Sequence, residues 1–75
     1  MLKKVLEILV EIDDSIDYEQ ETALIDGHLL DSFAIISLVG ELEDAFDISI
    51  ATAEMVPENF NSAAAIAAMV ERLSA

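Results

Sequence analysis

Cysteine is absent from this 75-residue sequence, and so is tryptophan. Without a thiol the chain can form no disulfide and no thiolate metal site, and any thiol chemistry would need an added group. Basic residues are scarce, because three lysine and arginine residues stand against sixteen acidic residues, for a formal net charge of −13. This balance argues against nucleic acid and anionic membranes as partners, and it favours a protein partner with a basic surface.

The hydrophobic fraction of 55% excludes intrinsic disorder despite that charge. The length predicts a single domain over residues 1–75, near the lower limit for a core without disulfides or metals. The opening stretch, MLKKVLEILVEIDD, joins two lysines to an apolar run, as a signal peptide does. Because Glu7 and Glu11 interrupt the run at helical spacing and no small-residue cleavage site follows, we interpret it as the first helix of a cytoplasmic, monomeric protein.

Apolar residues recur at steps of three and four in three segments, which predicts three main helices. The stripes are Leu2, Val5, Leu6, Leu9 and Ile12; then Phe33, Ile36, Leu38, Val39, Leu42 and Phe46; then Ile66, Met69, Val70 and Leu73. Asp31 is the predicted N-cap of the second helix, and Asn61 or Ser62 that of the third. Residues 52–56 predict one short helical turn, stopped by Pro57. The expected fold class is all-α, a small antiparallel helix bundle.

The segment from residue 13 to residue 31 lacks this periodicity and is rich in acidic residues. It is predicted to be a long first loop, held to the core by Ile16, Tyr18, Leu24 and Ile25. Gly27 would permit a turn there. Gly40, which costs about 1 kcal/mol relative to alanine inside a helix, predicts close packing at that point. Residues 47–50 are predicted to be an extended connection, and Met55 and Met69 to fill the core.

Ser32 is the first candidate for chemistry, and a hydrolase nucleophile would need a general base and usually a G-x-S-x-G turn. Asp31 and Phe33 flank it instead, and the only histidine is His28. A chain this small also lacks walls for a substrate pocket, so no enzyme activity is predicted. His28 is either a plain surface residue or, four residues before Ser32, a neighbour of a modified site.

A calcium loop of the EF-hand type could begin at Asp13. It would require glycine where Tyr18 stands and a bidentate glutamate where Leu24 stands, so the match fails at both discriminating positions. We therefore expect a solvated acidic surface, with loose divalent binding as the alternative and no defined metal site.

Ser32 is also a candidate for covalent modification. At the first turn of a helix, unpaired N–H groups and the macrodipole favour a bound phosphate. Serine is equally a common residue with which helices begin, so position alone leaves both interpretations open.

The segment LIDGHLLDSFAIISLVGELEDAFDISI resembles the acyl carrier protein family, whose members hold a phosphopantetheine arm on the serine of an Asp-Ser-Leu motif. Leu42, Glu43 and Phe46 fit the family's Leu-Glu-x-x-Phe pattern, and the likeness covers roughly residues 2 to 73. The similarity to the family's residue pattern continues through Ile48, Ile50, Phe60, Ser62 and Ile66. The motif here reads Asp-Ser-Phe. The short motifs at 29–32, 46–48 and 60–62 are most similar to stand-alone D-alanyl carrier proteins, and Ala34, Ile35 and Ser37 stand where fatty-acid carriers are acidic.

The resemblance implies a stand-alone carrier with 4'-phosphopantetheine on Ser32, beside Asp31. A phosphopantetheinyl transferase would attach the arm from coenzyme A, and its thiol would hold an acyl or aminoacyl group as a thioester. An adenylating ligase for an amino acid or small acid would load it, and an acyl-accepting enzyme would take the cargo. The residues expected to meet these partners are Leu30, Phe33, Ala34, Ile35, Glu41 and Asp44. The alternative is an unmodified acidic helical adaptor that binds a basic protein.

Overall fold

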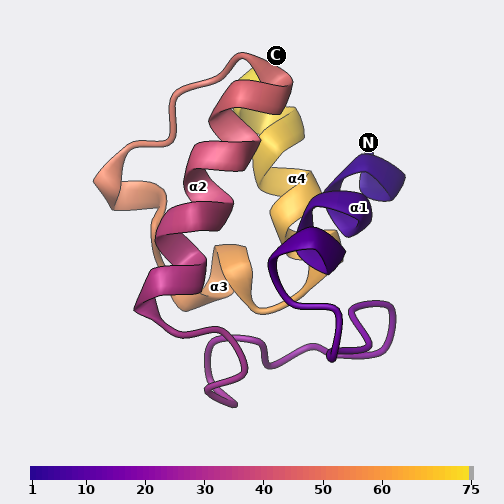
Figure 1. The fold of residues 1–75 in the computed structure, drawn as a ribbon. Coiled ribbons are helices and arrows are strands. Elements are labelled where there is room, and N and C mark those ends of the chain that lie inside the picture. Colours follow the sequence, from indigo (N-terminus) through magenta and orange to yellow (C-terminus); the bar gives the residue numbers. More distant parts are fainter. Residues whose placement is uncertain (75) are drawn as a thin grey trace.

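The helices follow the three apolar stripes of the sequence. The computed structural model describes residues 1–74, with α1 (Leu2–Ile12), α2 (Ser32–Phe46), the 3₁₀ turn η1 (Thr52–Glu54), α3 (Pro57–Phe60) and α4 (Ala63–Ser74). No strand occurs in this range, so the all-α prediction is confirmed. In Figure 1, α1 runs in the opposite sense to α2 and α4. The long loop between α1 and α2 lies at one end, whereas the start of α1 and the end of α4 lie at the other.

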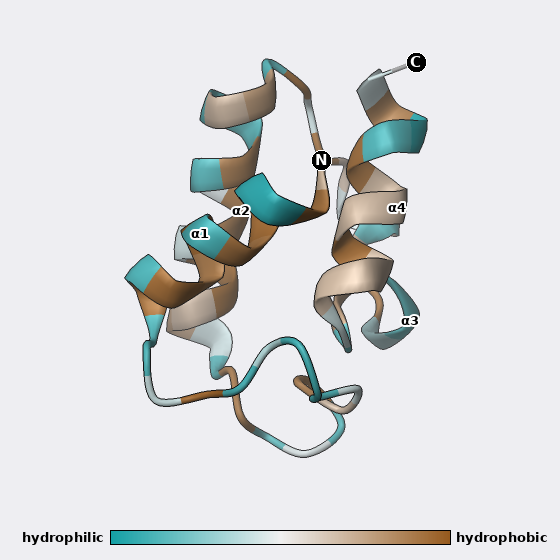
Figure 2. Cartoon of the chain, turned by 90° about the vertical axis from the view of Figure 1, so that its right-hand side faces the viewer, coloured by the Kyte–Doolittle hydropathy of each residue, from teal (hydrophilic) through white to brown (hydrophobic). Residues whose placement is uncertain are grey.

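One hydrophobic core joins these helices, and Figure 2 shows hydrophobic and hydrophilic residues alternating along each of them. Val5, Ile8 and Leu9 enter it from α1, and Leu38 and Leu42 enter it from α2. From α4 come Ala63, Ile66, Ala67, Met69 and Val70, and Phe60 adds the buried side chain of α3. Burying one Leu, Ile, Val or Phe side chain contributes about 1.5–3 kcal/mol. The core therefore holds α2 mainly through Leu38 and Leu42, while Ala34 and Ile35 of its first turn are partly buried against it.

Side-chain caps fix where the helices begin. The Asp31 carboxylate accepts a hydrogen bond from the Ala34 N–H at 2.8 Å, which confirms Asp31 as the N-cap of α2. Of the two caps predicted for α4, Ser62 is the one used, since its hydroxyl accepts from the Ala65 N–H at 3.0 Å. Pro57 does not merely stop the preceding turn: it occupies the first position of α3, where a missing N–H costs nothing.

Two residues of the apolar stripe predicted for α2 do not lie on its buried face. Phe33 is 82% exposed and Ile36 is 67% exposed. At 3.6 residues per turn, they lie about 140–160° around the helix from Leu38, on the opposite face. Gly40 is on that face as well, and a Cβ added there would meet nothing within 4 Å, so the predicted close packing is wrong. The apolar residues of α2 thus form two stripes, one buried and one in water.

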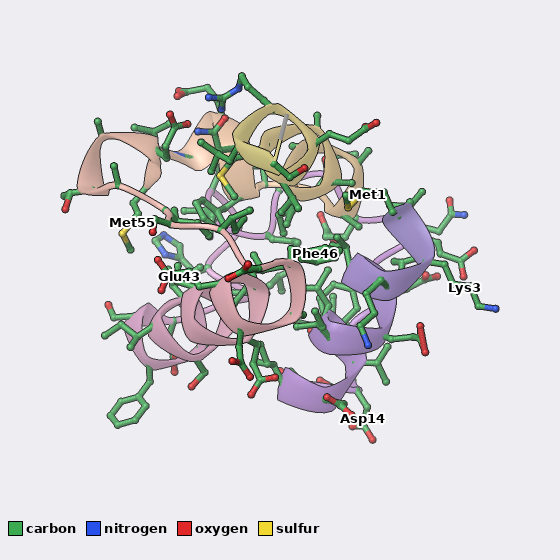
Figure 3. The ribbon with its side chains drawn as sticks, turned by 90° about the horizontal axis from the view of Figure 1, so that it is seen from above. Met1, Lys3, Asp14, Glu43, Phe46 and Met55 are labelled. Atoms are coloured by element: carbon green, nitrogen blue, oxygen red, sulfur yellow. The ribbon has the colours of Figure 1, made fainter. Side chains whose placement is uncertain are left out.

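Of the two methionines predicted to fill the core, Met69 is 1% exposed and Met55 is 40% exposed, so the prediction fails for Met55. Met55 follows η1 directly and points outward from the connection between α2 and α3, as labelled in Figure 3. Residues 48–50 form no helix or strand, whereas Asp47, which was also predicted to be extended, is the left-handed C-cap of α2 with φ 53°. The Glu43 carboxylate accepts from the Ile50 N–H at 2.8 Å and so holds this connection against α2.

The long first loop is anchored where the sequence predicted. Tyr18 and Leu24 are buried, and the Tyr18 hydroxyl donates to the Asp13 carbonyl at 2.6 Å. Burial raises the pKa of that phenol. Ser15 donates two hydrogen bonds to the Asp13 carboxylate, and these lower its pKa. In residues 1–74 no group of three or more histidine or acidic side chains could hold a metal ion, and no helix is long and apolar enough to cross a bilayer.

Candidate functional site

Ser32 is the first residue of α2 and is exposed. Its hydroxyl has no hydrogen-bond partner among residues 1–74, and the N–H groups of Ser32 and Phe33 find no acceptor there either. The Asp31 carboxylate accepts from the Ala34 N–H and forms no hydrogen bond with the Ser32 hydroxyl. The site presents a free hydroxyl beside two free N–H groups at the positive end of a helix dipole.

The chain reaches Ser32 through a tight turn over residues 23–30. The Leu29 N–H donates to the Leu24 carbonyl at 3.0 Å, and the His28 N–H donates to the Ile25 carbonyl at 3.0 Å. This pair of bonds is a Schellman motif, whose left-handed residue is usually glycine. Here the left-handed residue is His28, with φ 59°, and Gly27, which was predicted to permit a turn, lies directly before it in the turn. A Cβ on Gly27 would lie 2.6 Å from the Ala23 carbonyl oxygen, so Gly27 is required for close approach.

Asn61 fastens this turn to the junction between α3 and α4. Its side-chain oxygen accepts from the N–H groups of Ile25 and Asp26, each at 3.0 Å, and its Nδ2 donates to the Asp26 carboxylate at 3.0 Å. Its carbonyl accepts from the Leu24 N–H at 2.9 Å. The residue that the sequence offered as an alternative cap of α4 therefore holds the segment that leads to Ser32.

Open depressions lie on both sides of Ser32. One, of about 550 Å³, is lined by Ser32 itself with Ile25, Leu30, Ile35, Ile36 and Met55. The other, of about 570 Å³, lies between the end of α1 and the outer face of α2, and acidic residues and Phe33 line it. His28 and Asp31 are the two residues that line both. A group attached to Ser32 therefore has room on either side, and neither depression is an enclosed substrate pocket.

The wall of the first depression depends on a polar clamp. Arg72 binds Glu54 through two contacts, Nη2 to Oε1 at 2.7 Å and Nη1 to Oε2 at 3.0 Å. Asn59 donates to the Glu54 carbonyl at 2.7 Å. The hydrogen bonds with Arg72 lower the pKa of Glu54 and raise that of Arg72. This clamp holds η1, and with it the neighbouring Met55, to the far end of α4.

The predicted partner-binding residues divide by exposure. Phe33, Glu41 and Asp44 are exposed, and Ala34 and Ile35 are half-buried. Leu30 is only 5% exposed, so it supports the site from the core and presents no surface to a partner. Sequence reasoning missed the exposed Ile36 and the role of Asn61 in holding the turn before Ser32. The helical angle of Ile36 relative to Leu38 could have revealed the first, whereas no local signal marks the second.

The chemistry available here is narrow. No side chain among residues 1–74 is hydrogen-bonded to the Ser32 hydroxyl, so no general base is paired with it as a hydrolase requires. The site offers an accessible oxygen for an enzyme that brings its own catalytic groups.

No family model matches the chain. Among curated proteins, it is similar to a D-alanyl carrier protein of Lactococcus lactis subsp. cremoris strain MG1363, with 36% identity over 73 residues. This match covers 95% of the chain and 92% of the relative. The protein of the same name in Lactococcus lactis subsp. lactis strain IL1403 is 34% identical over the same shares of both chains.

Proposed function

This chain belongs to the D-alanyl carrier proteins of the acyl carrier protein family, and on that premise we propose that Ser32 bears its 4'-phosphopantetheine arm. Like its relatives, the chain is a carrier protein and not an enzyme. The observation that supports Ser32 most directly is its exposed hydroxyl, free of intramolecular hydrogen bonds among residues 1–74, at the start of α2.

The residues around Ser32 fit such a group. The free N–H groups of Ser32 and Phe33 suit a phosphodiester at a helix N-terminus. Asp31 brings a negative charge close by, but its carboxylate is engaged in the cap to Ala34. Once attached, the arm supplies a terminal thiol that holds an activated acyl or aminoacyl group as a thioester. The chain itself has no cysteine and cannot supply that thiol.

Attachment requires only an oxygen from this chain. The Ser32 hydroxyl oxygen forms an ester bond to the phosphorus of the phosphopantetheine unit, and the pyrophosphate bond of coenzyme A breaks. Adenosine 3',5'-bisphosphate leaves, and the hydroxyl proton passes to a base of the phosphopantetheinyl transferase. Magnesium and base both belong to that partner, which accounts for the absence of a base beside Ser32.

The exposed stripe of α2 is the proposed docking surface for the transferase, the adenylating ligase and the acyl-accepting enzyme. Phe33 and Ile36 provide its apolar centre, with the half-buried Ala34 and Ile35 beside them. Glu41 and Asp44 lie farther along the helix and give an acidic rim. An apolar centre with a charged rim fits a partner that offers an apolar pocket edged by basic residues.

We propose an aminoacyl cargo, with D-alanine as the first to test. The names of the relatives support this cargo. The apolar first turn of α2 supports it as well, because a ligase that binds a dense acidic surface would not recognise it. The shared core supports residues 1–75 as one carrier domain. Because the reaction draws on coenzyme A, we place it in the cytoplasm.

Intact-mass measurement tests the attachment site. Incubation with coenzyme A and a broad-specificity phosphopantetheinyl transferase should add the mass of one arm to the wild-type protein and none to Ser32→Ala. Ser37→Ala is the matched control, because Ser37 is an exposed serine on the same helix and should be labelled like wild type. Labelling of Ser32→Ala, or no labelling of wild type by several transferases, would refute the proposal.

A further inference from the structure

We propose that His28 is an arm-positioning residue: its imidazole binds the phosphodiester of the group on Ser32 and directs how that group leaves the protein surface. The inference rests on the proposed function of Ser32. Three observations carry it, namely the backbone conformation of His28, its place between the two depressions, and the distribution of positive charge.

The backbone at His28 is one that a β-carbon disfavours. Its φ of 59° lies in the left-handed region, where glycine is the usual residue of a Schellman motif. Only one other non-glycine residue among 1–74 has a positive φ, Asp47, the left-handed C-cap of α2. The fold alone would be served better by glycine at position 28, so the imidazole has a stability cost that folding does not explain.

The position of His28 matches a role at Ser32. Besides Asp31, it alone lines both depressions that flank the serine. The side chain is exposed and forms no hydrogen bond within residues 1–74. Its ring nitrogens are therefore available to a group that sits on Ser32. Asp31 is the other shared residue, and it can only accept hydrogen bonds when ionised.

Positive charge is otherwise remote from Ser32. Lys3 and Lys4 lie in the first turn of α1, and Arg72 lies in the last turn of α4, where it binds Glu54. Those two turns are at the end of the molecule opposite to the start of α2 (Figure 1). A phosphodiester on Ser32 would face Asp31 in a chain of net charge −13. Imidazole offers at least one N–H donor whether neutral or protonated, so it can bind the phosphate oxygens that the neighbouring acidic groups repel.

Nuclear magnetic resonance can detect this contact directly. The chain holds a single histidine, so its imidazole ¹⁵N resonances are assigned without further variants. Attaching the arm should move these resonances, and the ³¹P resonance of the folded protein should differ from that of the same protein unfolded in urea. In His28→Gly the ³¹P resonance should move toward the unfolded value, because the imidazole contact is lost and the N–H groups at the start of α2 remain. In His28→Asn, which tolerates the left-handed backbone and keeps an N–H donor, part of the displacement should remain.

Thermal unfolding separates this role from a structural one. His28→Gly should raise the Tm by a few degrees, because glycine relieves the left-handed backbone, and yet it should slow loading of the arm-bearing protein by the ligase. Asp47→Gly is the matched control: it relieves the same backbone region at the far end of α2 and should raise the Tm with loading unchanged.

The outcomes distinguish the two proposals. If mass analysis shows no arm on Ser32, the proposed function fails. If the arm is present but neither the imidazole nor the ³¹P resonance responds, the role of His28 is refuted. A lowered Tm in His28→Gly with unchanged ³¹P displacement would also refute it, since histidine would then serve the fold.

Discussion

Phe33 and Leu38 show that residue type alone does not determine burial on a helix, because the angular position of the residue matters as well. Both are large and apolar, and both belong to α2, but Leu38 has no exposed surface and Phe33 has 82% of its surface in water. They are five positions apart in the sequence, which is about 140° around the helix. Leu38 therefore faces the core and Phe33 faces solvent. The first belongs to folding and the second to the proposed docking of partners.

Alanine substitution should separate these two roles. Leu38→Ala should lower the free energy of unfolding by about 2–5 kcal/mol, because it leaves a cavity in the core. Phe33→Ala should change it by less than about 0.5 kcal/mol, as exposed substitutions usually do. The Phe33 variant should instead slow loading by the ligase. Urea titration followed by circular dichroism measures the first quantity, and a thioester assay measures the second. Equal destabilisation by the two variants would contradict the assignment of faces.

At the scale of the residue, sequence reasoning was strongest where local chemistry is sufficient. Asp31 as N-cap follows from residue type and position, because the cap needs only a carboxylate and an N–H three residues on. It failed at Leu30 and Met55, whose exposure depends on how segments distant in sequence meet. It could not locate the left-handed residue of the turn either, because a Gly-His pair leaves two candidates and only the hydrogen bonds choose His28.

Elements differ in how firmly they are held. The three main helices enter one core, whereas η1 contributes no buried residue and depends on the clamp of Glu54 with Arg72 and Asn59. That clamp crosses from the wall of the Ser32 depression to the last turn of α4. The periodicity of the sequence predicted the three main helices, but a four-residue α3 has too few turns to show a period. Eighteen residues separate the partners of the ion pair, so the sequence gives no cue to it.

Acid should release this clamp. Because Arg72 lowers the pKa of Glu54 below its ordinary value of 4.5, the stabilisation is complete above that value and is lost as the pH falls through the lowered pKa. Glu54→Gln should therefore have a lower Tm than wild type at pH 7, and the difference should disappear once the pH falls below the lowered pKa of Glu54.

Glu71→Gln is the control for this measurement. It removes one negative charge from an exposed position next to Arg72 without touching the ion pair. A Tm deficit of Glu54→Gln that persisted unchanged into strong acid would show that the ion pair does not contribute to it.

For the molecule as a whole, charge is the dominant feature. Sixteen acidic residues and three basic ones share a body whose Cα extents are 29 × 23 × 19 Å. Exposed charges interact over a Debye length of about 10 Å at 0.1 M salt and about 30 Å at 0.01 M. Self-repulsion therefore extends across the whole fold at low ionic strength and is confined to neighbours near physiological salt. Composition alone predicted this property, because it depends on the number of charges in a small volume.

The Tm should rise as sodium chloride is increased from about 0.01 M to 0.3 M. Magnesium chloride at equal ionic strength should raise it further, since a divalent cation neutralises acidic pairs more effectively. Glu19→Lys should give a smaller salt response, because it reduces the net charge by two at an exposed loop position. Differential scanning calorimetry at matched ionic strength gives the comparison, and a Tm independent of salt would show that repulsion is unimportant.

The separation of the few cations from Ser32 has a further consequence for how this molecule meets its partners. Lysines and arginine occupy one end, and the acidic first loop occupies the other, beside the start of α2 (Figure 1). The chain is therefore an electric dipole as well as a polyanion. In the field of a basic enzyme it experiences a torque that turns the serine end forward while the two molecules are still separated by solvent. The rotational search is therefore shortened before contact, and if the proposed partner enzymes each have a basic docking surface, the same orientation applies at every one of them.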